Sequence, residues 1–288
     1  MSFRQWFNVA IIACTCVAAP GCTDKGKVSE TKAQEHIEVL AKLADEDVEQ
    51  LRQGMPRGAK ALGELWEKEE EGKAPEPEIL RRRLDKVRDA DRDLALAKST
   101  FFAILDKEGT VIRSNQDPDN LVGKSMLTSF PELRRVLAGE YVETFGVMPE
   151  LQGSRTGPDE QWVVGAPIRN EQGEVIAAFV SGWSLERYAF RLEHQLRTDV
   201  TREAEQQGSG KVPLTYAFVF RGDRVYGAPI TPEVNEEALQ KLDLPAATKD
   251  GVVFHGQLEI TGRKYGVAAR RIDKLGSDAG IALIRSEI

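Results

Sequence analysis

Cysteine and histidine are scarce in this sequence, and their placement excludes most metal chemistry. The 288 residues include three cysteines, all within the first 22 positions, and three histidines that stand far apart, His36, His194 and His255. Neither an H-E-x-x-H nor a C-x-x-C-H motif is present. We therefore predict no metal site and no haem, and a body without disulfides that depends on its hydrophobic core for stability.

The usual signatures of catalysis are missing as well. The sequence has no G-x-S-x-G nucleophile elbow. Gly123-Lys124-Ser125 is similar to the end of a phosphate-binding loop, but Pro118 stands where that loop needs its first glycine. Asp117 and Asp119 flank this proline and are more typical of a turn than of a cation site. We predict a non-enzymatic protein without a cofactor.

Basic residues and long apolar runs are also limited. The chain has 39 Lys+Arg against 46 Asp+Glu, a formal net charge of −7. Nucleic-acid binding needs a basic stripe, so this balance argues against nucleic acid as the main partner. The only long apolar run lies at the N-terminus, which excludes a polytopic membrane protein, and a hydrophobic fraction of 41% excludes a fully disordered chain.

The N-terminus has the pattern of a secretory signal peptide. Residues 1–21 contain no acidic residue and one basic residue, Arg4. The apolar run from Trp6 to Ala19 is about 14 residues long, whereas a membrane-spanning helix needs roughly 20. We expect residues 1–21 to be removed on export by the general secretory route, because no Arg-Arg pair is present.

The end of this segment, Ala19-Pro20-Gly21-Cys22, resembles the lipobox of bacterial lipoproteins. The resemblance implies that Cys22 is lipidated and becomes the first mature residue, although Ala19 stands where the family usually has Leu. Cys14 is preceded by a better local match, but cleavage there leaves an apolar region of only about eight residues. The alternative is ordinary cleavage with Cys22 unmodified. A lipid-anchored protein of the cell envelope, facing the periplasm, is expected, and Thr23 after the cysteine favours the outer over the inner membrane.

Residues 30–98 are predicted to be helical. Residues 22–29 are polar and predict a tether. Over 30–98 apolar residues recur every three or four positions, which indicates helices facing a core. Pro56 and Gly58 are expected to interrupt the first helix. A shorter second helix is expected around Leu62, Leu65 and Trp66, and a third over 78–98.

After residue 99 the pattern changes from helix to strand. Two β-rich runs, 101–105 and 110–114, surround a turn that ends in Gly109 and predict a hairpin. A short helix and three more strands follow, and the same order of elements returns after a long helix. The predicted fold class is α+β, with an N-terminal helical segment and two PAS-like antiparallel-sheet domains. The predicted boundaries are 99–183 for the first sheet domain, 184–211 for a connecting helix and linker, and 212–288 for the second sheet domain.

The residues of the first block resemble the Cache domain, the extracytoplasmic sensor module of bacterial receptors. The resemblance rests on a D-x-x-G hairpin at Asp106 and Gly109, on Asn115, on the segment 121–124, and on the A-P-I strand and G-x-V-I hairpin within 166–175. The preceding helices and the weaker second block are similar to the double-Cache form. This resemblance implies that a small metabolite binds between the first sheet and its covering loop and helix.

The sequence departs from the family pattern in two places. Arg155 lies seven positions before Trp162, and Val163 follows the tryptophan, so the amino-acid-binding motif of the family is not matched and no amino-acid ligand is assigned. No output domain follows in this sequence, and we therefore expect a separate protein partner to carry the signal.

Six residues on or beside the first sheet are the candidate ligand-binding residues, because a specific pocket combines apolar walls with a few polar groups. Each has a structural alternative, either core packing or a surface ion pair. They are Arg113 and Asn115 at the end of the second strand, Tyr141 and Trp162 as an aromatic wall, Ser181 as a hydroxyl, and Arg134 as a cation for an anionic ligand.

The sequence supports two hypotheses of function. The first is a lipid-anchored sensor of the Cache type that binds a small molecule and signals through a separate partner. The second is a non-enzymatic envelope scaffold that binds no small ligand. The first hypothesis predicts a closed, polar-lined cavity in the first sheet domain, whereas the second predicts a filled core and an exposed apolar patch.

Overall fold

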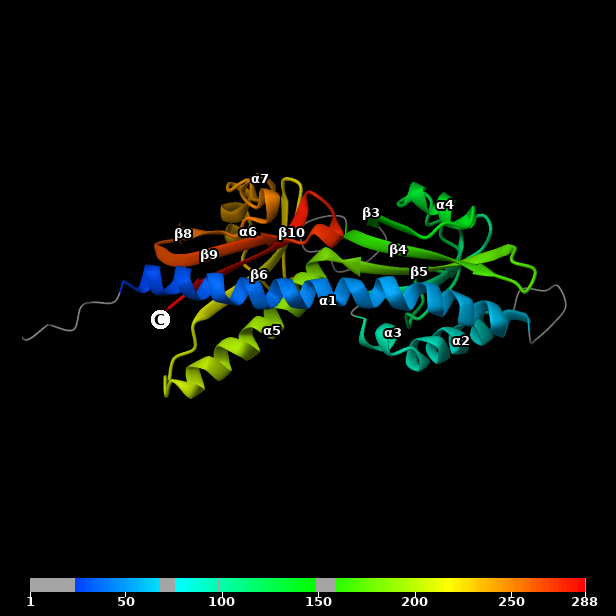
Figure 1. The fold of residues 1–288 in the computed structure, drawn as a ribbon, viewed down its shortest axis with the longest axis horizontal. Helices are drawn as coiled ribbons and strands as arrows, with labels where there is room; N and C mark the ends of the chain where they lie inside the picture. The colour runs from blue at the N-terminus through cyan, green and yellow to red at the C-terminus, as the bar shows by residue number, and fades with distance from the viewer. Residues whose placement is uncertain (1–23, 68–75, 98, 149–158, 288) are drawn as a thin grey trace, which may run out of the picture.

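The computed structural model describes residues 24–67, 76–97, 99–148 and 159–287. Two antiparallel sheets lie one after the other along a single long helix, α1 (Lys25–Glu67) (Figure 1). Within the described ranges, no helix combines the length and the hydropathy needed to cross a bilayer. The predicted signal peptide and Cys22 lie outside the described residues.

Helix α1 is longer and more continuous than the sequence suggested. The tether predicted over 22–29 is wrong for residues 25–29, because these form the start of α1, where Ser29 is buried. The helix also continues through Pro56 and Gly58. An internal proline costs about 3 kcal/mol, but burying a Leu or Met side chain stabilises by about 1.5–3 kcal/mol, so the apolar stripe outweighs the proline. The buried stripe consists of Ala33, Ile37, Leu40, Ala44, Val48, Leu51, Met55, Ala59 and Leu62.

The third predicted helix is divided in two. Asp91 ends α2 (Pro77–Ala90) and caps α3 (Arg92–Leu96), since its side chain accepts hydrogen bonds from the backbone N–H groups of Asp93 and Leu94. Such a cap satisfies donors that have no partner inside the helix.

Both sheets have five strands and the same topology, which confirms the predicted fold class and the repeated order of elements. The spatial order is β2-β1-β5-β4-β3 in the first sheet and β7-β6-β10-β9-β8 in the second, so each strand of the first sheet has a counterpart five strands later. The first sheet contains β1 (Phe101–Leu105), β2 (Val111–Ser114), β3 (Val142–Met148), β4 (Asp159–Arg169) and β5 (Val175–Ser184). The second contains β6 (Leu214–Arg221), β7 (Arg224–Gly227), β8 (Phe254–Ile260), β9 (Arg263–Arg271) and β10 (Ala279–Ser286).

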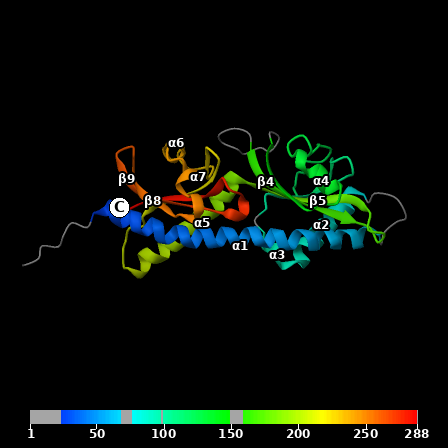
Figure 2. The ribbon, with the colours of Figure 1, turned by 45° about the horizontal axis from the view of Figure 1, so that its top comes forward.

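Short helices cover the faces of the sheets that point away from α1 (Figure 2). They follow the second strand of each sheet, at the same place in the order of elements. In the first sheet they are η1 (Pro131–Leu133) and α4 (Arg134–Leu137), and in the second α6 (Glu233–Gln240), α7 (Leu244–Ala247) and η2 (Lys249–Gly251). The remaining helices are the connecting α5 (Leu185–Gln206) and η3 (Asp273–Leu275).

One apolar core joins the two sheets through α1. The buried stripe of α1 belongs to a single cluster with Phe102 and Trp162 of the first sheet and Val219 and Leu283 of the second. Each sheet has a separate second core on its other face. Helix α1 therefore contributes to the cores of both sheets.

Candidate functional site

The face of the first sheet that points away from α1 is where the Cache resemblance places a ligand, and it is filled. Phe101, Val163 and Val180 of the sheet pack with Phe130 and other side chains of the covering segment into a buried apolar cluster. The contact is close, because a Cβ added to Gly165 on β4 would lie 2.7 Å from Cγ2 of Val136 on α4. The closed, polar-lined cavity predicted for this face is therefore replaced by a packed core.

Two of the predicted site residues make contacts within the fold at the end of the first hairpin. The side-chain oxygen of Asn115 accepts a 2.8 Å hydrogen bond from the backbone N–H of Phe102 and so ties the end of β2 to β1. The guanidinium of Arg113 lies 2.8 Å from Glu78 of α2 and 3.5 Å from Asp119. These are ion pairs and backbone contacts within the fold.

Three others take part in contacts away from the covered face of the sheet or lie at the surface. The Ser181 hydroxyl is buried and donates a 2.6 Å hydrogen bond to Ser99. Trp162 faces α1 and packs edge-on against Trp183, with ring centroids 4.9 Å apart. Arg134 is exposed on α4. The structure thus does not bring the six predicted residues together, and Tyr141 alone among them lines an open groove between α1 and the edge of the first sheet.

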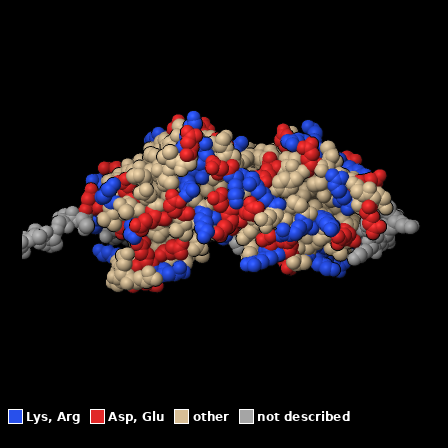
Figure 3. Space-filling model, in the orientation of Figure 1, with Lys and Arg blue, Asp and Glu red and all other residues tan. Residues whose placement is uncertain are grey.

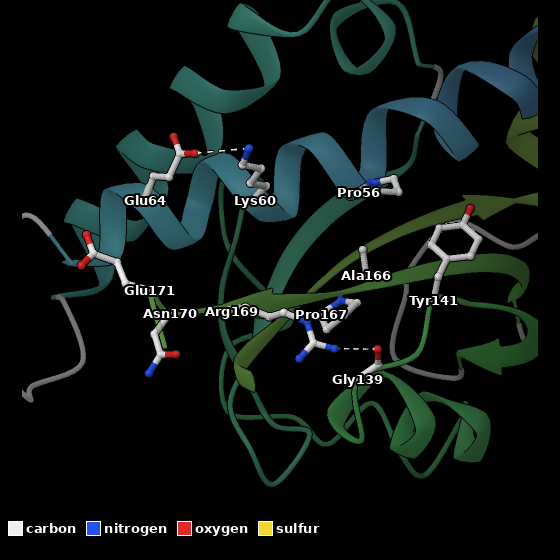
Figure 4. A pocket seen from close by; sticks show the side chains of 10 residues that line it. All are labelled: Pro56, Lys60, Glu64, Gly139, Tyr141, Ala166, Pro167, Arg169, Asn170 and Glu171. Atoms are coloured by element: carbon white, nitrogen blue, oxygen red, sulfur yellow. Dashed lines mark hydrogen bonds and ion pairs between the residues drawn. The ribbon is translucent and has the colours of Figure 1, made fainter. Parts of the chain in front are cut away.

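That groove exists because β3 is shorter than its neighbour. β3 begins at Val142, opposite Gly165, whereas β4 continues to Arg169. The last residues of β4 therefore have a partner strand on the β5 side only, and α1 crosses the open edge (Figure 4). The space between them has a volume of about 510 Å³ and is lined by Pro56, Lys60, Glu64, Gly139, Tyr141, Ala166, Pro167, Arg169, Asn170 and Glu171.

The apolar part of the groove comes from both walls. Pro167 lies at the unpaired edge of β4, where the missing N–H of proline leaves no donor without a partner. Pro56 and Ala166 contribute further apolar surface, and the Tyr141 ring lies at one end (Figure 4). Most ligand pockets combine such apolar walls with a few polar groups, and their volumes run from about 300 to 1,000 Å³.

The Tyr141 phenol is fixed and stays protonated. Its hydroxyl donates a 3.1 Å hydrogen bond to Glu143, which is held in turn by the Arg52 guanidinium at 2.7 Å. Burial, followed by the negative charge of Glu143, raises the pKa of Tyr141 well above its usual value of about 10. Tyr141 therefore offers a neutral aromatic wall at physiological pH.

Charged side chains lie on both sides of the groove. The Arg169 guanidinium donates hydrogen bonds to the backbone carbonyls of Gly173 at 2.8 Å and Gly139 at 2.9 Å. On α1, Lys60 and Glu64 form a loose ion pair of 4.0 Å. Among the described residues no group of His, Cys, Asp and Glu is arranged to hold a metal ion.

Most of this groove was not predicted from the sequence, and its α1 side was missed because of Pro56. With a helix break expected at Pro56, Lys60 and Glu64 were not expected to lie on a helix that crosses the sheet. The signal was present, because the apolar stripe of Met55, Ala59 and Leu62 continues in register beyond the proline.

Comparison with known proteins places the fold among sensor domains. No family model matches the sequence, and no curated protein matches it either. A domain from the sensory box/GGDEF family of Vibrio parahaemolyticus matches with a TM-score of 0.58 at 11% identity, covering 92% of this chain and 98% of that one. The periplasmic sensory domain of the Campylobacter jejuni chemoreceptor Tlp1 matches with a TM-score of 0.51 at 10% identity, covering 91% and 96%.

A third match extends beyond the length of this chain. An extracellular ligand binding receptor from Desulfohalobium retbaense has a TM-score of 0.51 at 11% identity over 88% of this chain. This chain spans 40% of that receptor. At these identities the likeness concerns the fold, and the fold is that of a PAS-like, double-Cache-like sensor domain.

Proposed function

We propose that the protein is a lipid-anchored sensor of the bacterial cell envelope that binds a small molecule in the groove between α1 and β4. The observation that carries this proposal is the groove itself, an open cavity of about 510 Å³ in a double-Cache-like fold. Its walls come from α1 and from the end of the first sheet, so a bound molecule would bridge the two. We propose no catalytic role.

Helix α1 would transmit the effect of ligand binding from the groove to the second sheet domain. A ligand in the groove contacts α1 near Pro56 and Lys60, and the same helix forms the core of the second sheet domain. A shift of α1 against β4 would therefore change packing in the second domain. A separate partner protein would read that change.

The proposed lipid on Cys22 fits the position of α1. The helix begins at Lys25, three residues after Cys22, and an extended chain spans at most about 3.6 Å per residue. The start of α1 would lie about 10 Å from the acylated residue. A helix rises about 1.5 Å per residue, so Pro56 would lie some 45 Å along α1, with the groove far from the membrane.

Lipid anchoring is tested by replacing the cysteine. We expect Cys22→Ala to move the protein from the membrane to the soluble periplasmic fraction, because the acyl chains that would anchor it are lost. Fractionation followed by immunoblotting measures this, with Cys14→Ala as the matched control that stays at the membrane. Retention of the Cys22→Ala protein at the membrane would contradict the anchor.

Ligand binding is tested by a thermal-shift screen of the purified protein against amino acids, organic acids, amines and nucleobases. A ligand at 100 times its Kd adds about 2.7 kcal/mol to the folded state. For a chain of this size 1 kcal/mol moves the midpoint by about 2–4 °C, so a hit is visible. We expect a saturable rise that Tyr141→Ala abolishes, while Arg134→Ala, outside the groove, leaves it intact.

The scaffold hypothesis is the second candidate, and two observations favour it. The face of the first sheet away from α1 is filled by apolar side chains. Phe190 on α5 and Ile230 before α6 are large apolar residues that are 48% and 65% exposed, and Thr231 joins their two elements by a hydrogen bond to Glu193. A flat thermal-shift screen together with a protein that binds through Phe190 would favour the scaffold.

A further inference from the structure

We infer that the groove takes a monocarboxylate with a compact apolar or aromatic body, and that Arg169 binds the carboxylate. This inference rests on the proposed function, because it specifies the ligand of the same site. It differs from an amino-acid ligand, since it assigns no partner to an ammonium group.

Among the described residues that line the groove, one cation lies without a counter-ion. Lys60 and Glu64 form an exposed ion pair of 4.0 Å on α1, and Glu171 has an interaction of its own. Within the described part of the chain, the polar contacts of the Arg169 guanidinium are the two carbonyls of Gly139 and Gly173, which are neutral. At Arg169 the groove therefore favours a negatively charged group of the ligand.

Arg169 is also held in place for this task. A guanidinium has five N–H donors, and the two carbonyl contacts use two of them. The carbonyls come from the loop before β3 and from the β4–β5 turn, so they fix the orientation of the side chain from both sides. A fixed guanidinium with free donors matches a carboxylate, which it can bind through two parallel hydrogen bonds.

The rest of the groove fits an apolar body. Pro56, Ala166, Pro167 and the Tyr141 ring offer rigid apolar surface that loses little conformational entropy on binding. Glu64 is engaged by Lys60, so an α-ammonium group would lose water without gaining a free carboxylate. We therefore expect an acid to bind better than the amino acid of the same shape.

Calorimetric titration of the purified protein tests the inference with three probes that share one body. The probes are 3-phenylpropionate, 3-phenylpropionamide and phenylalanine, with 4-methylpentanoate, its amide and leucine as an aliphatic set. We expect at least one acid to bind at least tenfold more tightly than its amide and its amino acid. Arg169→Gln should weaken that acid at least tenfold and leave the amide unchanged.

Controls separate a lost contact from a damaged fold. Arg169→Lys keeps the positive charge but cannot form the two parallel hydrogen bonds of a guanidinium, so it should give an intermediate affinity. Arg134→Gln removes an exposed arginine of the first sheet domain that does not line the groove, and it should change nothing. Circular dichroism and the midpoint of thermal unfolding show whether each variant is folded, and a variant that does not fold is replaced by Arg169→Lys in the comparison.

Several outcomes would overturn the inference while leaving the proposed function intact. These are an amide or amino acid that binds as tightly as its acid, an acid whose affinity Arg169→Gln and Arg169→Lys do not change, and a thermal-shift hit from another chemical class that depends on Tyr141 when no acid binds. If no compound in either experiment binds the wild-type protein, the proposed function itself fails.

Discussion

Glu203 on α5 connects the first helix, α1, to the last strand, β10, by ion pairs. Its carboxylate lies 2.8 Å from Lys32 of α1 and 2.8 Å from Arg285 of β10, and His36 of α1 lies 3.3 Å away. Burial opposes its charge, but Lys32 and Arg285 prevail and lower the pKa of Glu203 to about 2. Burial and the neighbouring Arg285 also lower the pKa of His36. Both groups favour the folded protein in their high-pH forms.

This cluster predicts a loss of stability in acid. The folded pKa of Glu203 lies below the unfolded value of 4.5, so its contribution is complete above 4.5 and is lost as the pH falls towards about 2. We expect Glu203→Gln to lower the free energy of unfolding at pH 7 by about 1–3 kcal/mol and to flatten the pH dependence in that window. Urea unfolding at several pH values measures it. Glu205→Gln, an exposed neighbour on α5, is the control; equal effects of the two variants would contradict this role.

At the residue scale, single residues of the candidate site could be predicted from the sequence better than which residues lie together. Tyr141 was selected and lines the groove, but it was grouped with Trp162 and Ser181, which lie elsewhere. Arg169 was not selected, because nothing local distinguishes it from other hairpin arginines. Its role depends on a carbonyl from Gly139, thirty residues earlier, and on α1.

The element that positions the site is α1, and Gly63 determines how closely it lies to β4. Gly63 is buried, and a Cβ added there would collide with the backbone carbonyl oxygen of Arg169. A helix interior normally favours Ala over Gly by about 1 kcal/mol. Glycine at this position therefore reflects the close approach of helix and strand.

Gly63→Ala should destabilise the protein by about 1–3 kcal/mol despite the better helix propensity, because the added methyl forces α1 away from β4. The same shift should weaken ligand binding in the groove. Chemical denaturation measures the first effect and calorimetry the second. Gly210→Ala, whose Cβ would meet nothing within 4 Å, is the matched control. A Gly63→Ala protein as stable as wild type would mean that helix and strand are not in this contact.

Element boundaries followed from local pattern where packing agreed with propensity. The hairpin of β1 and β2 was predicted from its turn and β-rich runs, and it lies where expected. The break in α1 was predicted from Pro56 and is absent, because burial of the residues around it prevails. Rules that use only neighbouring residues cannot compare the cost of an internal proline with the stabilisation from burial against a sheet that is distant in sequence.

At the scale of the whole molecule, a buried carboxylate joins the two sheets. Glu160 at the start of β4 accepts hydrogen bonds from Arg221 and from the Tyr226 hydroxyl, and it lies 3.3 Å from Arg224. The Arg221 guanidinium also lies over the Phe145 ring of β3, 4.3 Å from its centroid. This contact and the packing on α1 together join the two sheets. On the face of the molecule seen in Figure 3, basic and acidic side chains are intermixed.

We expect the protein to unfold in one cooperative calorimetric transition, because the core along α1 includes residues of both sheets. Glu160→Gln should lower its midpoint by about 2–12 °C, the equivalent of about 1–3 kcal/mol, since three donors lose a charged acceptor. Glu259→Gln, an exposed carboxylate on β8, should leave the midpoint unchanged. Two separate transitions in the wild-type protein would show that the sheets are independent.

The overall architecture could be predicted because the same order of elements occurs twice in the sequence. The repeated order of two strands, helix and three strands indicates two sheets of one topology, and the structure has them. The filling of the face away from α1 could not be predicted, since it depends on how the segment before β3 folds over the sheet.

Hydrogen exchange across the whole chain, with and without a saturating ligand from the screen, tests the central claim most directly. If the protein is a sensor that binds its ligand between α1 and β4, protection should increase in 56–64 of α1, around 139–141 and in 166–171. Protection confined to the covering segment 121–137, or no change anywhere with a ligand that raises the melting temperature, would contradict the groove as the binding site.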